Sequence, residues 1–211
     1  MAKLIHLALA LLLMALTPSV GLCGLCVNEI MADPATDWDG DGVYNAVGDE
    51  WVELYNSGPG HVELSEFALS DNQGLWTYGF GDGDVLSAGE AIVIYGGQSK
   101  EWQASEGRPQ YGFKLSNDGD TVILWQVAGG DTLLVDSHTF NTYEAEDDRS
   151  TGRNPDGIGV WQIFDALNPY TGSTPPPGNG LPPTPGRPNV GDPPPVETGE
   201  NTWGEVKSLF H

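Results

Sequence analysis

The hydrophobic positions of the chain fall in short runs with a period of two, separated by Gly, Asp, Asn and Pro. Between residues 50 and 55, for example, Val52 and Leu54 alternate with charged or aromatic neighbours, so that one face of a strand can enter a core. The pattern predicts strands at residues 27–31, 50–55, 61–64, 66–69, 75–80, 91–95, 121–125, 133–140 and 160–164. Roughly seven to nine short strands predict a β-sandwich or barrel.

No long stretch has the spacing of an amphipathic helix, except in part the first residues and the extreme C-terminus. The 29 Gly and 16 Pro residues make turns frequent, and 18% charged residues are too few for a coiled coil. The hydrophobic content of 39% is enough for one sizeable core. We therefore expect one all-β domain, at residues 22–171.

The N-terminus has the features of a signal peptide, residues 1–21. Lys3 is followed by an apolar run, and Ser19-Val20-Gly21 is a small-x-small cleavage site. A membrane anchor would need about 18 or more apolar residues, and Pro18 interrupts this run early. We expect export, a mature protein that is secreted or held at the cell surface, and no integral membrane segment after cleavage.

The two cysteines, Cys23 and Cys26, are spaced C-x-x-C just after this site. A redox motif would open a helix in a βαβ unit, which is not predicted here. Lipid modification, a local disulfide and inert thiols all remain open, and no disulfide framework holds the fold together.

Residues 172–200 are rich in Pro and Gly, which favours an extended, semi-rigid segment, although residues 184–189 can still belong to the end of the domain. The final residues, 201–211, carry a short apolar group, Trp203, Val206, Leu209 and Phe210. This tail is interpreted either as a docking or sorting element, or as a segment that folds back or frays.

Net charge narrows the possible partners. Eight Lys and Arg against thirty Asp and Glu give a formal charge of -22. Attraction to phosphate backbones or anionic lipid would have the wrong sign, so nucleic acid is not expected as a partner.

Several sequence blocks occur in an order that resembles the lamin tail domain: VNEIM (27–31), DEWVELYN (49–56), LSEFALSD (64–71), LSAGEAIVI (86–94) and LSNDGDTVIL (115–124). GRNPDG (152–157), Trp161 and TPGRPN (184–189) are similar to the end of bacterial versions. The resemblance implies an immunoglobulin-like β-sandwich and, in exported bacterial proteins, a surface or adhesion module that is often attached to hydrolases. The insert after residue 36 and residues 75–83 depart from the family pattern.

That insert contains the strongest chemical motif, DWDGDGVYNAVGDE at residues 37–50. Its start matches a calcium loop of the EF-hand type, with oxygen ligands at positions 1, 3 and 5 and Gly42 at position 6. Position 12 is Gly48, so the last carboxylate would come one or two residues late. The predicted ligands of a structural Ca²⁺ are Asp37, Asp39, Asp41, the Val43 carbonyl, Asn45, and Asp49 or Glu50. The alternative is an acidic turn without metal.

Catalytic motifs are absent from the sequence: it has no nucleophile elbow, His-Glu-x-x-His or phosphate-binding loop. Glu144 and Asp147 could form a glycosidase-like pair, but residues 144–148 are interpreted as a solvated acidic loop. His138 is interpreted as a hydrogen-bonded sheet residue. We expect no enzyme and no catalytic residues.

These observations predict an exported, calcium-stabilised binding or adhesion module for an extracellular or cell-surface protein or polysaccharide. A carbohydrate-binding module is the main alternative, with Trp38, Trp76 and Trp102 available for sugar stacking, whereas Trp51, Trp125 and Trp161 are expected in the core. A small secreted hydrolase is a third possibility.

Overall fold

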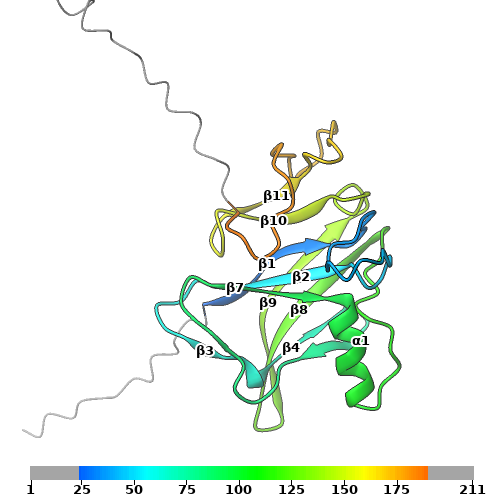
Figure 1. Cartoon of the computed structure of the whole chain (residues 1–211). Helices are drawn as coiled ribbons and strands as arrows, with labels where there is room; N and C mark the ends of the chain where they lie inside the picture. The colour runs from blue at the N-terminus through cyan, green and yellow to red at the C-terminus, as the bar shows by residue number, and fades with distance from the viewer. Residues whose placement is uncertain (1–23, 190–211) are drawn as a thin grey trace, which may run out of the picture.

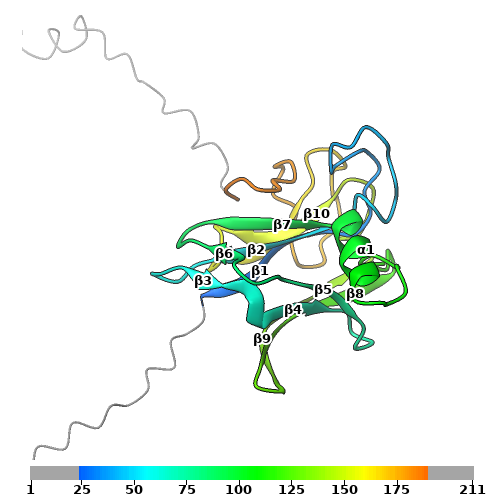
Figure 2. The same cartoon turned by 60° about the horizontal axis from the view of Figure 1, so that its bottom comes forward.

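The computed structural model describes residues 24–189, which form two antiparallel layers with one helix at their end (Figures 1 and 2). The first sheet has the order β11-β10-β1-β2-β7 and the second β5-β4-β8-β9. Their bounds are β1 Leu25–Met31, β2 Trp51–Asn56, β4 Phe67–Ser70, β5 Trp76–Gly79, β7 Ala91–Tyr95, β8 Gly119–Ala128, β9 Asp131–Asn141, β10 Ser150–Asn154 and β11 Val160–Phe164. A small ribbon, β3 Val62–Glu63 and β6 Val85–Leu86, joins them beside the 3-10 turn η1 Leu64–Glu66. The all-β sandwich is confirmed.

Several sequence predictions lie outside the described residues: the signal peptide at 1–21, Cys23, the segment from 190 to 200, and the tail at 201–211. In the part of the chain that is described, no helix has the length and apolar character needed to cross a membrane.

The core lies between the two sheets and follows the predicted alternation. Val52 and Leu54 of β2 face Leu69 of β4 and Leu124 of β8 within one cluster of fully buried side chains. Burial of this apolar surface is the main source of stability, at roughly 25 cal/mol per Å². All nine predicted strands are present, with ends shifted by a few residues.

The outer face of the first sheet is polar yet buried. A bulge between Val27 and Glu29 places Asn28 on this face, where its amide donates to Glu53 Oε1 (2.7 Å) and Asp156 Oδ1 (2.8 Å). Glu29 and Glu53 are register partners on β1 and β2, and neither is exposed. Burying two carboxyl groups side by side is costly unless hydrogen bonds and protons compensate.

The segment that covers this face is residues 184–189, which we call the clasp. The backbone N–H groups of Thr184 and Gly186 donate to Glu29 Oε1 (3.1 Å) and Glu53 Oε2 (2.7 Å). Before the clasp, the N–H of Ile163 in β11 donates to the Pro177 carbonyl (2.9 Å). Residues 184–189 therefore pack on the sandwich, as the sequence allowed, because the backbone of Thr184 and Gly186 covers buried carboxyl groups.

Burial and the clasp act in opposite directions on the charge of Glu29. Thr184 Oγ1 lies 2.8 Å from Glu29 Oε2 and also contacts Asn189 Oδ1. The Asn189 amide nitrogen donates to the Arg153 carbonyl (3.1 Å). Burial raises the pKa of Glu29 to about 7 and that of Glu53 to about 8, although hydrogen bonds from Ser150, Thr184 and Asn189 lower the pKa of Glu29.

The helix α1 Gly96–Ser105 was not predicted. It covers the free edge of β5, where Ser99 Oγ donates to the Thr77 carbonyl (2.6 Å). Gln103 exchanges two hydrogen bonds with the backbone of Gly112 (2.9 and 3.0 Å). The buried residues of the helix are Gly96, Ser99 and Gln103, so polar contacts replace the apolar stripe by which a helix is recognised in a sequence.

Two further strands, β6 and β10, were also missed. β10 has the sequence STGRN and is buried at three of its five positions. Its place between β1 and β11 comes from backbone pairing and side-chain hydrogen bonds, such as Ser150 Oγ to Glu29 Oε1 (2.5 Å), instead of from apolar alternation.

The end of the β8–β9 hairpin projects away from the two layers (Figure 2). Gly129 and Gly130 form its turn with positive φ, and Leu133 and Leu134 are 63% and 53% exposed. Only the part of the hairpin that faces β4 and β1 contributes to the core.

The raised carboxyl pKa values predict that stability falls as pH rises from 5 to 9. Glu29, Glu50 and Glu53, with pKa values of about 7, 8 and 8 against ordinary values of 4.5, keep protons in the folded protein that the unfolded chain has released. Their contribution is complete below pH 4.5 and is lost by about pH 8, a loss on the order of several kcal/mol. Urea unfolding at pH 5, 7 and 9 measures this fall in the free energy of unfolding.

The matched control is Glu29→Gln with Glu53→Gln, in which both groups stay neutral at every pH. We expect a clearly flatter pH profile for this variant, with the remaining slope due to Glu50. Identical profiles for the two proteins would show that these glutamates ionise normally in the fold.

Candidate metal centre

The predicted calcium loop connects β1 to β2 and is organised around the buried carboxylate of Asp49. Asp49 Oδ1 accepts the N–H groups of Trp38 (2.8 Å) and Asp39 (3.1 Å), and its Oδ2 accepts that of Asn45 (2.6 Å). One side chain just before β2 therefore fixes both halves of a long insert.

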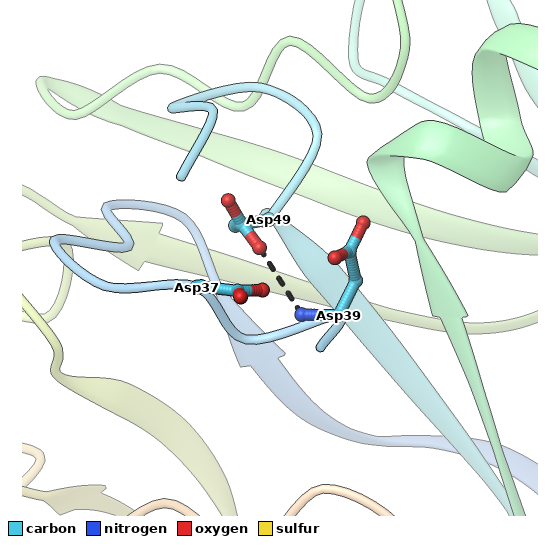
Figure 3. A group of neighbouring side chains, drawn as sticks. All are labelled: Asp37, Asp39 and Asp49. Carbon is cyan, nitrogen blue, oxygen red and sulfur yellow. Dashed lines mark hydrogen bonds between the residues drawn. The ribbon is translucent and has the colours of Figure 1, made fainter. Parts of the chain in front are cut away.

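Three acidic side chains of the loop come together. Carboxylate oxygens of Asp37, Asp39 and Asp49 lie within 4.8 Å of one another (Figure 3). Two oxygens that bind one Ca²⁺ at about 2.4 Å can be no more than about 5 Å apart, so this spacing suits a single ion. An all-oxygen donor set with three negative charges is also the chemistry that calcium prefers.

The hydrogen bonds within the loop leave the carboxylate oxygens with acceptor capacity for such an ion. Asp37 accepts the N–H groups of Gly40 (2.8 Å) and Gly42 (2.9 Å), and Asp39 Oδ1 accepts that of Asp41 (2.9 Å). A carboxylate oxygen has more than one lone-pair direction, so these bonds orient the oxygens without using all of their acceptor capacity. Gly40 and Gly42 have φ values of 76° and 91°, which allow the tight turns.

The other predicted ligands lie outside this group of three. Asp41 Oδ1 accepts the N–H of Val43 (2.7 Å), and Asn45 Oδ1 accepts that of Gly48 (2.8 Å). Both side chains close local turns. The backbone of Val43 is at the exposed end of the loop, and its side chain is 66% exposed.

Glu50 points to a different part of the molecule. It is 3% exposed and accepts hydrogen bonds from the backbone N–H groups of Leu115 and Lys114, while its Oε2 has no partner among the described residues. Burial raises the pKa of Glu50 to about 8. Of the two residues considered for the last ligand, the structure brings Asp49 to the cluster and sends Glu50 inward.

The sequence contained a signal for this choice. Glu50 has the same parity as Val52 and Leu54, which face the core, whereas Asp49 lies before the strand where the alternation does not apply. If the alternation of β2 is extended back to residue 50, it predicts that the Glu50 side chain faces the protein interior.

The electrostatics of the cluster favour a cation. The Asp41 backbone N–H lowers the pKa of Asp39, but desolvation and the charges of Asp41, Asp49 and Asp37 outweigh it, so the pKa lies above its usual value. The neighbouring carboxylates therefore oppose ionisation of Asp39, and a divalent ion would remove that repulsion.

A residue that the sequence analysis assigned to solvent supports the same loop. Asp148 Oδ1 accepts from the N–H of Ala35 (2.8 Å) and from Trp38 Nε1 (2.7 Å). Asp148 is more than a hundred residues away in the chain, with φ of 53°. A local sequence pattern does not predict this contact, because the β9–β10 connection places Asp148 beside the loop only in the folded protein.

The solvated acidic loop at 144–148 is also corrected at Glu144, which is buried. Its carboxylate accepts from Thr151 Oγ1 (2.8 Å) and the Asn141 N–H (2.9 Å), and lies 3.4 Å from His138 Nε2. Burial alone would raise the pKa of Glu144, but these hydrogen bonds and the charge of His138 lower it below its usual value. His138 stacks on Trp161 at 3.4 Å between ring centroids.

The tryptophans considered for sugar stacking make internal contacts. Trp38 packs against the buried Trp51, Trp76 against Trp125, and Trp102 against Tyr78, with ring centroids 6.1–6.4 Å apart. All three are half-buried. Trp51 lies fully in the interior, whereas Trp125 and Trp161 are only partly buried.

We predict that Asp49→Ala destabilises the protein by about 3 kcal/mol, because three N–H groups lose a charged acceptor. Urea unfolding at pH 6 in a chelator measures this without any metal contribution. Asp82→Ala, which removes an exposed carboxylate from another turn, is the control and should change stability by less than about 0.5 kcal/mol. Equal effects would mean that Asp49 does not organise the loop.

Comparison with known proteins agrees with this architecture. The sequence model of the Lamin Tail Domain family matches residues 22–142, which is more than half of the chain and runs from β1 to the end of β9. No curated protein matches the chain. The antiparallel two-layer fold is the immunoglobulin-like sandwich of that family. The chain belongs to the Lamin Tail Domain family.

Proposed function

We propose that the protein is an exported, non-enzymatic binding or adhesion module whose β1–β2 loop holds a structural calcium ion. The observation that carries the proposal is the convergence of Asp37, Asp39 and Asp49 on one small volume. Family membership supports the binding role, because lamin tail domains are immunoglobulin-like binding domains. The leader at residues 1–21 supports export.

Calcium would act on the loop and not on a substrate. The three carboxylates would hold the ion, with Asp41, Asn45 or the Val43 carbonyl available to complete its oxygen shell. The ion would neutralise charges that repel one another in a protein of net charge -22. It would thereby hold the insert against β2 and the N-terminal end of α1, where the Gly97 N–H donates to the Gly48 carbonyl (3.1 Å).

The partner proposed is an extracellular or cell-surface protein or polysaccharide. Among the described residues, the half-buried tryptophans are engaged with other rings, so they offer no ready platform for stacking a sugar. This favours a protein partner over a polysaccharide. A glycan array and a pull-down with cell-envelope proteins would distinguish the two.

Calcium is predicted to raise the melting temperature of the mature protein. Binding to the folded state alone contributes RT ln(1 + [L]/Kd), about 2.7 kcal/mol at a hundredfold excess over Kd. For a domain of this size that corresponds to about 5–10 °C. Thermal unfolding with millimolar calcium and with chelator, at fixed ionic strength, measures the shift.

The variant that tests the site is Asp39→Asn, which keeps the acceptor for the Asp41 N–H but removes one charge. In chelator it should be at least as stable as the natural protein, and it should lose most of the calcium-dependent shift. Asp82→Asn, an equal charge change at an exposed turn, should keep the full shift. If calcium and chelator give the same curve for the natural protein, the loop is an acidic turn without metal.

Export predicts a defined mature N-terminus. Mass spectrometry of the protein recovered from the cell exterior should find a first residue between positions 22 and 27, after cleavage near Gly21. A chain that retains Met1 and stays in the cytoplasm contradicts the proposal.

A further inference from the structure

A second site of different chemistry lies at the opposite end of α1. Between the turn before β5 and the loop that follows α1 there is a cavity of about 100 Å³, which we call the α1 pocket. Its walls are mostly apolar and aromatic: Leu75, Trp76, Pro109, Tyr111 and Phe113. An apolar cavity of about 150 Å³ accommodates a benzene molecule, so this one suits a single aliphatic side chain or part of a ring.

The pocket is preformed. Gln103 of α1 holds Gly112 in the far wall through both backbone groups, with Gly112 N–H to Oε1 at 2.9 Å and Nε2 to the Gly112 carbonyl at 3.0 Å. The wall residue Lys114 and the residue after it, Leu115, donate their backbone N–H groups to the buried Glu50. A wall held in place in this way loses little entropy when a ligand enters.

Two cations line the pocket, Arg108 and Lys114. The guanidinium of Arg108 lies over the Trp102 ring at 5.5 Å, and the Lys114 ammonium lies over the Tyr111 ring at 5.4 Å. Across residues 24–189, neither cation forms an ion pair with a carboxylate. By contrast, Arg149 and Arg153 donate hydrogen bonds to backbone carbonyl groups, and Arg153 also donates to Asp136.

Among the lysine and arginine side chains at residues 24–189 only Arg153 forms an ion pair, so Arg108 and Lys114 are both available to a carboxylate. Their place beside an apolar cavity specifies the ligand by charge complementarity: an apolar side chain next to a carboxylate. The sequence contains a segment of this chemistry outside the described residues. Glu205 lies next to Val206, within the apolar group of Trp203, Leu209 and Phe210.

That segment can reach the pocket. Leu209 is 20 residues beyond Asn189, and a chain of this length spans up to about 65 Å. A compact domain of this size is only about 40 Å across. The tail is therefore long enough to reach any point on its own domain.

We propose that the α1 pocket binds residues 201–210 of the chain, with an apolar side chain of the tail in the cavity and the Glu205 carboxylate against Arg108 and Lys114. This assignment does not depend on calcium or on the external partner, because it uses none of the loop carboxylates. It gives the tail a docking place on the domain itself.

Hydrogen exchange on the full mature chain tests the proposal. The variant Trp203→Ala, Leu209→Ala, Phe210→Ala should exchange the amides of residues 108–114 about tenfold faster than the natural chain, equivalent to about 1.4 kcal/mol. Adding a synthetic peptide of residues 197–211 to this variant should restore the slower exchange. Equal exchange in the natural chain and the triple variant overturns the proposal.

Charge reversal at the pocket provides the matched comparison. Arg108→Glu with Lys114→Glu, introduced into the triple variant, should abolish the effect of the peptide, whereas Arg187→Glu, an exposed cation elsewhere, should leave it unchanged. A peptide of the same composition in scrambled order should have no effect. If the peptide acts equally on the charge-reversed protein, or the scrambled peptide acts equally well, the pocket is not the site of the tail.

Discussion

Glu29 and Glu53 sit side by side on the outer face of the two central strands, fully removed from water. Three parts of the structure compensate for this burial by donating hydrogen bonds to the two carboxyl groups. The bulge at β1 brings an amide to Glu53, β10 supplies the hydroxyl of Ser150 to Glu29, and the clasp adds backbone N–H groups to both. Residues 184–189 therefore pack on the sandwich although they lie beyond the last strand.

The loop between β1 and β2, which is proposed to bind calcium, is also organised by buried or partly buried carboxylates that accept several hydrogen bonds. Asp49 and Asp148 each gather several donors from a segment that has little apolar surface of its own. Asp49 orders the loop from within, and Asp148 attaches it to the β9–β10 connection. A metal ion would add to an arrangement that the protein already holds by charge-assisted hydrogen bonds, which is why its proposed role is stabilising.

The sandwich could be predicted because its strands alternate, as Val52 and Leu54 illustrate, and because Asp and Gly mark the turns between them. β10 and α1 could not, since Ser150, Ser99 and Gln103 are held by hydrogen bonds whose partners are distant in sequence. The acidic cluster could be predicted in part. The spacing of Asp37 and Asp39 is local, but the inward turn of Glu50 and the support from Asp148 depend on tertiary packing.

The clasp also determines how the domain would respond to mechanical load. If the protein is anchored by the chain that follows Asn189, a pulling force enters the fold at that residue. It meets first the hydrogen bonds of residues 184–189, most of which end on side chains, and then the backbone bonds of residues 177–181 to β11 and its end. The ladder of β10 and β11 is loaded only after these bonds have broken. The short covering segment would then peel away at low force while both sheets stay intact, and the domain would lengthen before it unfolds.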